Sequence, residues 1–209
     1  MKNLMKFAAA LTLGAFLFTA CSEDEDVILS VPADATLDLG AEFNPMAGVT
    51  VDGIDISEVS WQAMPDWNIY EVNHYVFTYT AADQTADRNV YISSKLLAGT
   101  YDVSDLEDGD TTPITYEVTV LQHVDEYNKL LIQGFAGFST TANATINGNI
   151  ITVAEYKPSS WLAGESISAT GTYNGENRAL VSFDIIIKEL VGGEIVTTYS
   201  NATYTKVAN

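Results

Sequence analysis

Two tryptophans are the residues whose type and setting point most directly to ligand binding. Trp67 lies in residues 64–68 and Trp161 in residues 157–162, and both segments contain a proline and several polar side chains, which predicts loops. An indole in a loop presents a flat apolar face that stacks on a sugar ring, with nearby polar groups available for the sugar hydroxyls. The alternative is that each indole anchors its loop to the core. Trp61, in residues 58–62, is expected in the core.

Carboxylates supply most of the remaining chemical groups, with 28 Asp and Glu in 209 residues. The densest groups fall in two predicted loops, one with Asp105, Glu107, Asp108 and Asp110 and the other with Asp52 and Asp55. Clustered carboxylate oxygens can hold Ca²⁺, but neither loop has the spacing of an EF-hand. We interpret both as solvated acidic loops and predict no metal site, with calcium binding as the alternative.

The sequence offers little for catalysis. His74 and His123 are the only histidines, and each lies in a strand-like segment without a predicted partner. The chain has no nucleophile elbow and no glycine-rich phosphate loop between a strand and a helix. A carboxylate pair of the glycosidase type cannot be chosen among so many acids. We therefore predict no enzyme and no cofactor, and keep a glycan-active enzyme as the last of three hypotheses.

The only cysteine, Cys21, follows an N-terminal targeting pattern. Lys2 and Lys6 precede an apolar run over residues 7–18, which is short for a membrane span and typical of a signal peptide over residues 1–20. Residues 17–20 together with Cys21 resemble the lipobox of bacterial lipoproteins. The resemblance implies that the Cys21 thiol carries a diacylglyceryl group and becomes the first residue of the mature chain. The alternative is a free cysteine after an ordinary signal peptide.

The residues after Cys21 suggest a location. Ser22 next to the cysteine fits outer-membrane retention, and the acidic residues 23–26 resemble the surface-export signal of Bacteroidota lipoproteins. The resemblance implies a lipid anchor in the cell outer membrane and display on the surface, whereas the simpler interpretation of residues 21–26 is a solvated tether. A formal charge of −19 excludes nucleic acid as a partner, because a phosphate backbone requires a basic surface.

The mature chain shows strand periodicity throughout. Aromatic residues alternate with other side chains over residues 74–80, and over residues 115–120 Tyr116, Val118 and Val120 alternate with Thr and Glu. Asn147-Gly148, Asn174-Gly175 and Gly192-Gly193 separate such segments at hairpin spacing. The sequence therefore predicts an all-β chain of short antiparallel strands.

We predict two consecutive β domains, residues 27–95 and 96–209. Residues 35–93 resemble the bacterial immunoglobulin-like domains of Bacteroidota surface lipoproteins and crystal toxins, through residues 37–50, residues 75–83 and the final strand through Val90 and Ile92. This resemblance implies an immunoglobulin-like sandwich with a spacer or adhesive role. Residues 98–207 resemble a second lipoprotein module of unknown function, through residues 98–101, 131–135, 144–153 and 167–173, and are expected to form a sandwich or open barrel.

Together these features predict a non-enzymatic surface lipoprotein that binds glycan or a partner protein through its second domain. The first alternative is a structural or adhesion component that binds only proteins. Cys21 is the predicted membrane attachment, and Trp67 and Trp161 are the candidate ligand-binding residues.

Overall fold

The computed structural model describes residues 26–208 and confirms the all-β prediction. The described residues contain fourteen strands and three single-turn 3₁₀ helices, η1 (Ile56–Glu58), η2 (Ser94–Leu97) and η3 (Phe135–Gly137). Within residues 26–208, no helix has the length and apolar character needed to cross a membrane. The predicted signal peptide, Cys21 and all of the tether except Asp26 lie outside the described residues.

The N-terminal part, residues 26–98, contains two small sheets. Strands β1 (Ile28–Ser30) and β3 (Thr50–Asp52) form one of them. The other has four strands in the order β2 (Ala35–Asp38), β6 (Gln84–Ser93), β5 (His74–Ala81) and β4 (Ser60–Ala63). The expected antiparallel pairing has one exception, because β2 runs parallel to β6. The immunoglobulin-like identity of residues 27–95 stays a prediction.

Residues 99–206 form a closed eight-stranded barrel, and the expectation of a sandwich or an open barrel was therefore wrong. Each strand pairs antiparallel with the next one along the chain, and the last pairs with the first. The strands are β7 (Gly99–Glu107), β8 (Ile114–Gln122), β9 (Lys129–Gln133), β10 (Thr141–Asn147), β11 (Ile150–Tyr156), β12 (Ser166–Asn174), β13 (Ala179–Val191) and β14 (Glu194–Lys206).

Closure comes from the pairing of β14 with β7, in which Lys206 lies opposite Tyr101 and Ser200 opposite Glu107. These two strands stand at opposite ends of the barrel sequence, so no local turn signal announces their pairing. The sequence predicts the hairpins between neighbouring strands but not the pairing of β14 with β7 that closes the barrel. Closure also removes both sheet edges, which would otherwise present unpaired backbone groups to other chains.

The predicted hairpin turns are present. Gly192 and Gly193 form the two-residue loop between β13 and β14, with φ angles of 63° and 92° that other residues adopt at a cost. Between β10 and β11 the loop residues are Gly148 and Asn149, one position later than the Asn-Gly pair itself. Glycine at the first loop position, with φ of 59°, is typical of a type II′ turn.

The barrel interior is filled with aromatic rings at the end that faces the N-terminal part. Tyr204 lies between Tyr101 and Phe183, with ring centroids 6.1 and 5.0 Å apart, and Phe183 meets Phe135 edge-on at 5.7 Å. The backbone N–H of Leu180 and the carbonyl of Leu97 are both bonded to the Tyr101 hydroxyl. This end of the barrel is therefore packed solid and offers no entry to a ligand.

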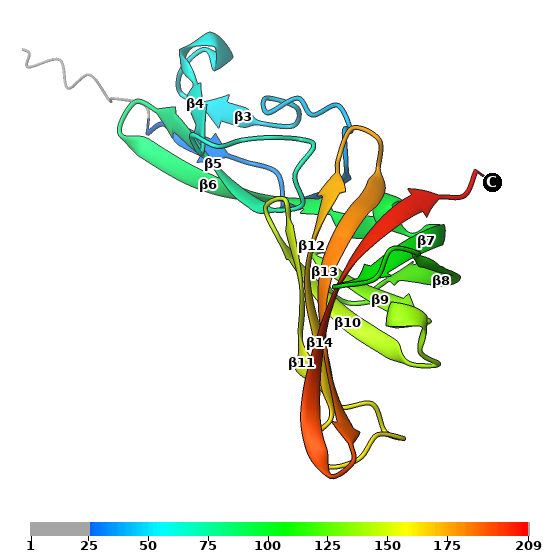
Figure 1. The fold of residues 1–209 in the computed structure, drawn as a ribbon. Helices are drawn as coiled ribbons and strands as arrows, with labels where there is room; N and C mark the ends of the chain where they lie inside the picture. Colours follow the sequence, from blue (N-terminus) through cyan, green and yellow to red (C-terminus); the bar gives the residue numbers. More distant parts are fainter. Residues whose placement is uncertain (1–25, 209) are drawn as a thin grey trace, which may run out of the picture.

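The N-terminal part sits over this packed end (Figure 1). The backbone N–H of Val72 donates to the Tyr173 hydroxyl at 2.6 Å, and that hydroxyl donates to the Gly148 carbonyl at 2.8 Å. A Cβ added at Gly175 would lie 1.8 Å from the Tyr70 carbonyl oxygen, so only glycine permits this approach. The β13–β14 hairpin extends from the opposite end of the barrel (Figure 1).

Candidate functional site at the barrel mouth

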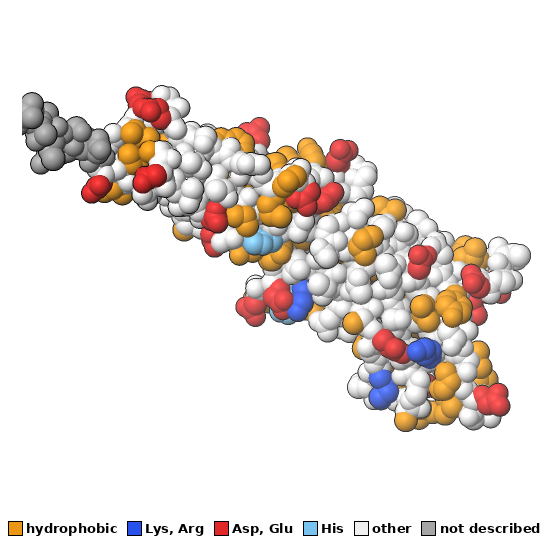
Figure 2. Space-filling model, turned by 90° about the vertical axis from the view of Figure 1, so that its left-hand side faces the viewer, with side chains coloured by type: hydrophobic (Ala, Val, Ile, Leu, Met, Phe, Trp, Pro, Cys, Tyr) orange, Lys and Arg blue, Asp and Glu red, His pale blue; other side chains and the backbone are white. Residues whose placement is uncertain are grey.

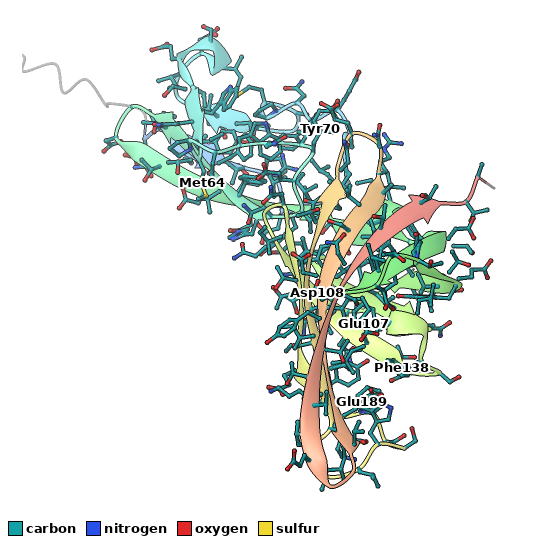
Figure 3. The ribbon with its side chains drawn as sticks, in the orientation of Figure 1. Met64, Tyr70, Glu107, Asp108, Phe138 and Glu189 are labelled. Carbon is teal, nitrogen blue, oxygen red and sulfur yellow. The ribbon has the colours of Figure 1, made fainter. Side chains whose placement is uncertain are left out.

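A cavity of about 220 Å³ opens at the barrel end opposite the N-terminal part. Glu107, Phe138 and Glu189 lie toward this end in Figure 3. We call it the barrel mouth, and its lining residues are Asp105, Glu107, Asp110, Thr112, Ile114, Ala136, Phe138, Ile187, Glu189, Thr198 and Ser200. They come from four strands, the β7–β8 loop, η3 and the residue that follows η3, so only the closed barrel brings them together.

Strand register stacks the inward side chains of β7 and β14 in layers. Nearest the opening, Ser200 lies opposite Glu107, and one layer deeper Ala202 lies opposite Asp105. The third layer places Tyr204 opposite Val103, which in turn pairs with Tyr116 on β8. Because side chains alternate across a strand, all of these point into the barrel. The mouth is therefore polar, and it ends on the aromatic packing described above.

Asp105 is the central polar group of the mouth. Its side chain is only 5% exposed, and its Oδ2 accepts a hydrogen bond from the Tyr116 hydroxyl at 3.1 Å. Among the described residues, four buried side-chain atoms have no hydrogen-bond partner, namely Asp105 Oδ1 and the hydroxyls of Ser200, Tyr204 and Tyr156. Buried polar atoms normally have partners, because an unpaired one costs a few kcal/mol. Two of the four unpaired atoms, Asp105 Oδ1 and the Ser200 hydroxyl, belong to residues that line the mouth, which indicates a binding site for a ligand with polar groups.

The two tyrosines near Asp105 keep their protons. Burial raises the pKa of the Tyr116 hydroxyl well above its usual value, and the nearby Tyr204 and Asp105 raise it further. Burial, followed by the proximity of Asp105, also raises the pKa of Tyr204. Both hydroxyls therefore remain neutral donors at any physiological pH, and Tyr204 lies in the layer below the mouth rather than in its lining.

The wall of the mouth has a mixed character. Ile114, Ala136, Phe138 and Ile187 supply its apolar side. The acidic side consists of Asp105, Glu107, Asp110 and Glu189, and the lining residues, all within the described chain, include no Lys, Arg or His. The Asp108 N–H donates to the Tyr199 carbonyl at 2.8 Å and the Asp110 N–H to the Glu107 carbonyl at 3.0 Å, so the acidic loop is held against β14.

Trp161 borders this mouth, because its ring meets Phe138 edge-on with centroids 4.8 Å apart. The Lys157 ammonium donates to the Trp161 carbonyl at 2.8 Å and so fixes the β11–β12 loop. The indole is half-buried, and thus it both anchors its loop and leaves surface at the rim. Of the two candidate tryptophans, Trp161 is the one that the fold places beside the cavity.

Trp67 lies in a different environment, in the N-terminal part. Its ring packs edge-on against Tyr75 at 4.8 Å and Phe77 at 4.9 Å, and both of these residues are fully buried. The structure thus shows a loop-anchoring contact for Trp67. Trp61, which we expected in the core, is 45% exposed on the short edge strand β4. The edge position explains the difference, since one side of β4 has no neighbouring strand.

The first acidic segment also differs from its prediction. Asp105 and Glu107 belong to β7 rather than to a loop, and strand alternation turns them into the barrel. In the other predicted acidic loop, Asp55 is the N-cap of η1, and its carboxylate accepts a hydrogen bond from the Ser57 N–H at 2.8 Å. Within residues 26–208, no three His, Cys, Asp or Glu side chains are grouped closely enough to hold a metal ion.

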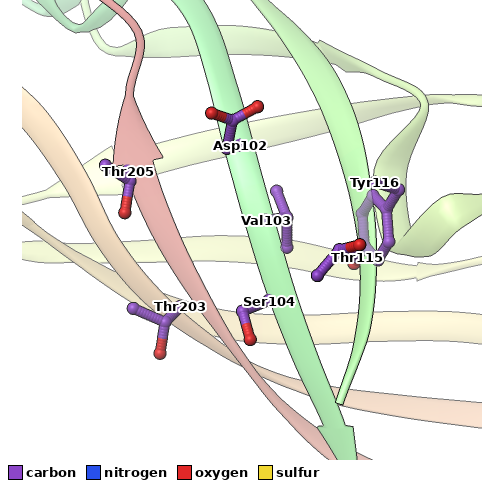
Figure 4. A pocket seen from close by; sticks show the side chains of 7 residues that line it. All are labelled: Asp102, Val103, Ser104, Thr115, Tyr116, Thr203 and Thr205. Carbon is purple, nitrogen blue, oxygen red and sulfur yellow. The ribbon is translucent and has the colours of Figure 1, made fainter.

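A second depression, about 460 Å³ in volume, lies on the outer face of β7, β8 and β14 (Figure 4). Its polar lining consists mainly of the outward-facing Asp102, Ser104, Thr115, Thr203 and Thr205. These hydroxyls and the carboxylate are exposed to water, so no buried polar atom lacks a partner there. We favour the smaller barrel mouth as the functional site, because Asp105 and Ser200 hold buried polar atoms there that have no partner.

No known family model matches the chain, and no curated protein matches it in sequence. Among solved structures, the lipoprotein BT2262 from Bacteroides thetaiotaomicron is similar at 17% sequence identity, with a TM-score of 0.37. The match covers 86% of this chain and 100% of that one. Similarity of this degree leaves the function to be argued from the residues themselves.

Proposed function

We propose that this protein is a non-enzymatic, lipid-anchored outer-membrane protein, displayed on the cell surface, that binds the end of a glycan chain at its barrel mouth. The observation that carries this proposal is the enclosed cavity with the unpaired Asp105 Oδ1 and Ser200 hydroxyl. Eight-stranded barrels have an interior just wide enough for side chains or one small ligand. Here the aromatic rings fill one end and leave the other open.

The composition of the mouth supports a carbohydrate ligand. A sugar offers hydroxyl donors to Asp105 and acceptors to the Ser200 hydroxyl, and its apolar ring face suits Phe138. Trp161 beside Phe138 extends the aromatic surface to the rim, where further sugar units of a chain would lie. A cavity of about 220 Å³ is smaller than the usual range of roughly 300–1,000 Å³ for small-molecule sites, which favours a chain end over a long segment.

The position of the mouth supports display toward the exterior. The described chain begins in the N-terminal part, whereas the mouth lies at the far end of the barrel (Figure 1). A lipid on Cys21 would hold the N-terminal side near the membrane and direct the mouth outward. Acidic side chains are spread along the face seen in Figure 2, which keeps the protein solvated and away from anionic headgroups.

The experiment for the binding proposal is an oligosaccharide panel tested on the soluble chain from residue 22 onward. We expect retention on at least one polysaccharide gel, and we expect Phe138→Ala to abolish it while the exposed outer-face variant Thr203→Ala retains it. No retention on any polysaccharide, or equal retention by Phe138→Ala, would contradict the proposal. Anchoring is tested separately: a clickable palmitate analogue should label the wild type, and Cys21→Ala should lose the label.

A second function is favoured by a specific surface feature. The β13–β14 hairpin next to the mouth exposes five large apolar side chains, namely Leu190, Val191, Ile195, Val196 and Tyr199, each 37–58% exposed. Exposed apolar groups of this kind are typical of protein contacts. They support the alternative of a structural or adhesion component that binds only proteins. Co-purification of a membrane partner that sugars do not displace, and that a Val191→Ser and Ile195→Ser variant loses, would favour it.

A further inference from the structure

We propose that the ligand of the barrel mouth presents a positively charged amino group to Asp105, which makes an amino sugar the favoured chain end. This inference rests on the proposed binding function and adds the chemical class of the ligand. Three observations support it. Asp105 Oδ1 is buried and unpaired, the charged residues of the lining are all acidic, and the neighbouring lysines are bonded to other groups.

The cross-strand neighbours of Asp105 supply no hydrogen-bond donor to its Oδ1. Its neighbours across β14 and β8 are Ala202 and Ile114, and neither has a polar side chain. Tyr116 satisfies Oδ2 at 3.1 Å, which leaves Oδ1 without a partner although the residue is 95% buried. An acceptor that is built into a cavity without a donor requires one from the ligand.

The surroundings of Asp105 select a cation over a neutral donor. Glu107, Asp110 and Glu189 add three carboxylates to the same lining. The two nearby lysines are engaged elsewhere: Lys157 donates to the carbonyls of Pro158 and Trp161, and Lys188 pairs with Glu155 at 2.7 Å. A cavity lined by one sign of charge with low-dielectric walls concentrates the opposite charge. An ammonium therefore gains more here than a hydroxyl does.

The size of the cavity limits what can carry the ammonium. A volume of about 220 Å³ equals roughly seven water molecules at about 30 Å³ each. One sugar ring or a small aryl amine fits this volume. The apolar side formed by Ala136, Phe138 and Ile187 then faces the body of the ligand while Asp105 meets the amino group.

Calorimetric titrations of the soluble chain from residue 22 onward test the inference. The ligands are a glucosamine trisaccharide, its fully N-acetylated counterpart, 2-phenylethylamine and 2-phenylethanol. The two trisaccharides differ at three amino groups, which N-acetylation makes neutral, and the two phenyl compounds differ at one group. Both comparisons are made on the wild type and so do not depend on a variant that folds. The protein variants are Asp105→Asn, which keeps the shape and an acceptor for Tyr116, and Asp102→Asn, the matched control on the outer face of the same strand.

We expect the charged member of each pair to bind at least about tenfold more tightly than the neutral one, because a hydrogen bond between two charged groups is stronger than one to a neutral donor. Asp105→Asn should remove this preference and Asp102→Asn should keep it. Neutral members that bind as tightly as charged ones would overturn the inference and leave the glycan proposal standing. Asp105-dependent binding of 2-phenylethylamine alone would support the ammonium and contradict the glycan. Binding by none of the four would overturn the inference, and the oligosaccharide panel decides the glycan proposal separately.

Discussion

The Tyr173 hydroxyl joins the two parts of the molecule by accepting the Val72 N–H at 2.6 Å and donating to the Gly148 carbonyl at 2.8 Å. Val72 is fully buried, so its N–H has no access to water when this hydroxyl is removed. The barrel and the N-terminal part are therefore connected through a buried hydrogen-bond chain and not only through the backbone at η2. This contact fixes the position of the barrel relative to the N-terminal part.

Tyr173→Phe should weaken this connection with little change to the barrel itself. We expect the free energy of unfolding to fall by about 1–3 kcal/mol, since a buried N–H is left unpaired. Chemical denaturation measures the change, and limited proteolysis should show faster cleavage between residues 94 and 98. The exposed Tyr199 provides the control, because Tyr199→Phe should leave both measurements at wild-type values.

The stability of the protein should fall steeply in alkali. Burial raises the pKa of Tyr101 and Tyr173 to about 12, whereas an unfolded tyrosine loses its proton near pH 10. Below about pH 10 both hydroxyls are protonated in the folded and the unfolded state, so they give the free energy of unfolding no pH dependence. Between about pH 10 and about pH 12 they ionise mainly in the unfolded state, and the free energy of unfolding therefore falls as pH rises. Denaturation curves across this window should show a shallower loss for Tyr173→Phe than for the wild type. Equal slopes would contradict burial of Tyr173.

The two candidate tryptophans should separate into a structural and a functional residue. Trp67→Ala removes edge-on contacts to two buried rings, and we expect a loss of about 3 kcal/mol in the free energy of unfolding. Trp161→Ala removes the contact with Phe138 at the rim and should cost less stability while it weakens ligand binding. Thermal denaturation and ligand titration of both variants provide the comparison. The opposite pattern would place the ligand at the N-terminal part.

Asp105→Asn should leave the fold as stable as the wild type or stabilise it by about 1 kcal/mol. The neutral amide still accepts the Tyr116 hydrogen bond, and it is cheaper to bury than a carboxylate without a second partner. Groups placed for a ligand commonly cost stability in its absence. Chemical denaturation of the wild type and of Asp105→Asn measures the difference in their free energies of unfolding. A loss of more than about 1 kcal/mol would instead mean that Asp105 serves the structure.

Local sequence patterns predicted the strands and hairpins because those features depend on neighbouring residues. The Gly192-Gly193 pair sits in the loop it was expected to form, and alternation over residues 74–80 matches the buried and half-buried faces of β5. Barrel closure depends on the pairing of β7 with β14, whose residues are far apart in the chain. No local pattern carries that information, which is why the sheet appeared open.

The candidate site could not be predicted from the sequence for the same reason. Asp105 stands among acidic residues and looks like part of a solvated loop, yet residues 101, 103 and 105 continue one alternating pattern into the barrel. Following that alternation through the acidic run would have placed Asp105 on the inner face. Even so, its neighbours Ser200 and Phe138 come from distant segments, and only the closed barrel brings them beside it.

The most direct test of the barrel mouth as the ligand site is a two-dimensional NMR titration with the tightest-binding sugar from the oligosaccharide panel. We predict that the largest backbone amide shifts occur at Asp105, Phe138 and Ser200, with little change at the outer-face residues Thr203 and Thr205. Shifts confined to the outer face or to the N-terminal part, with the mouth unchanged, would contradict the account.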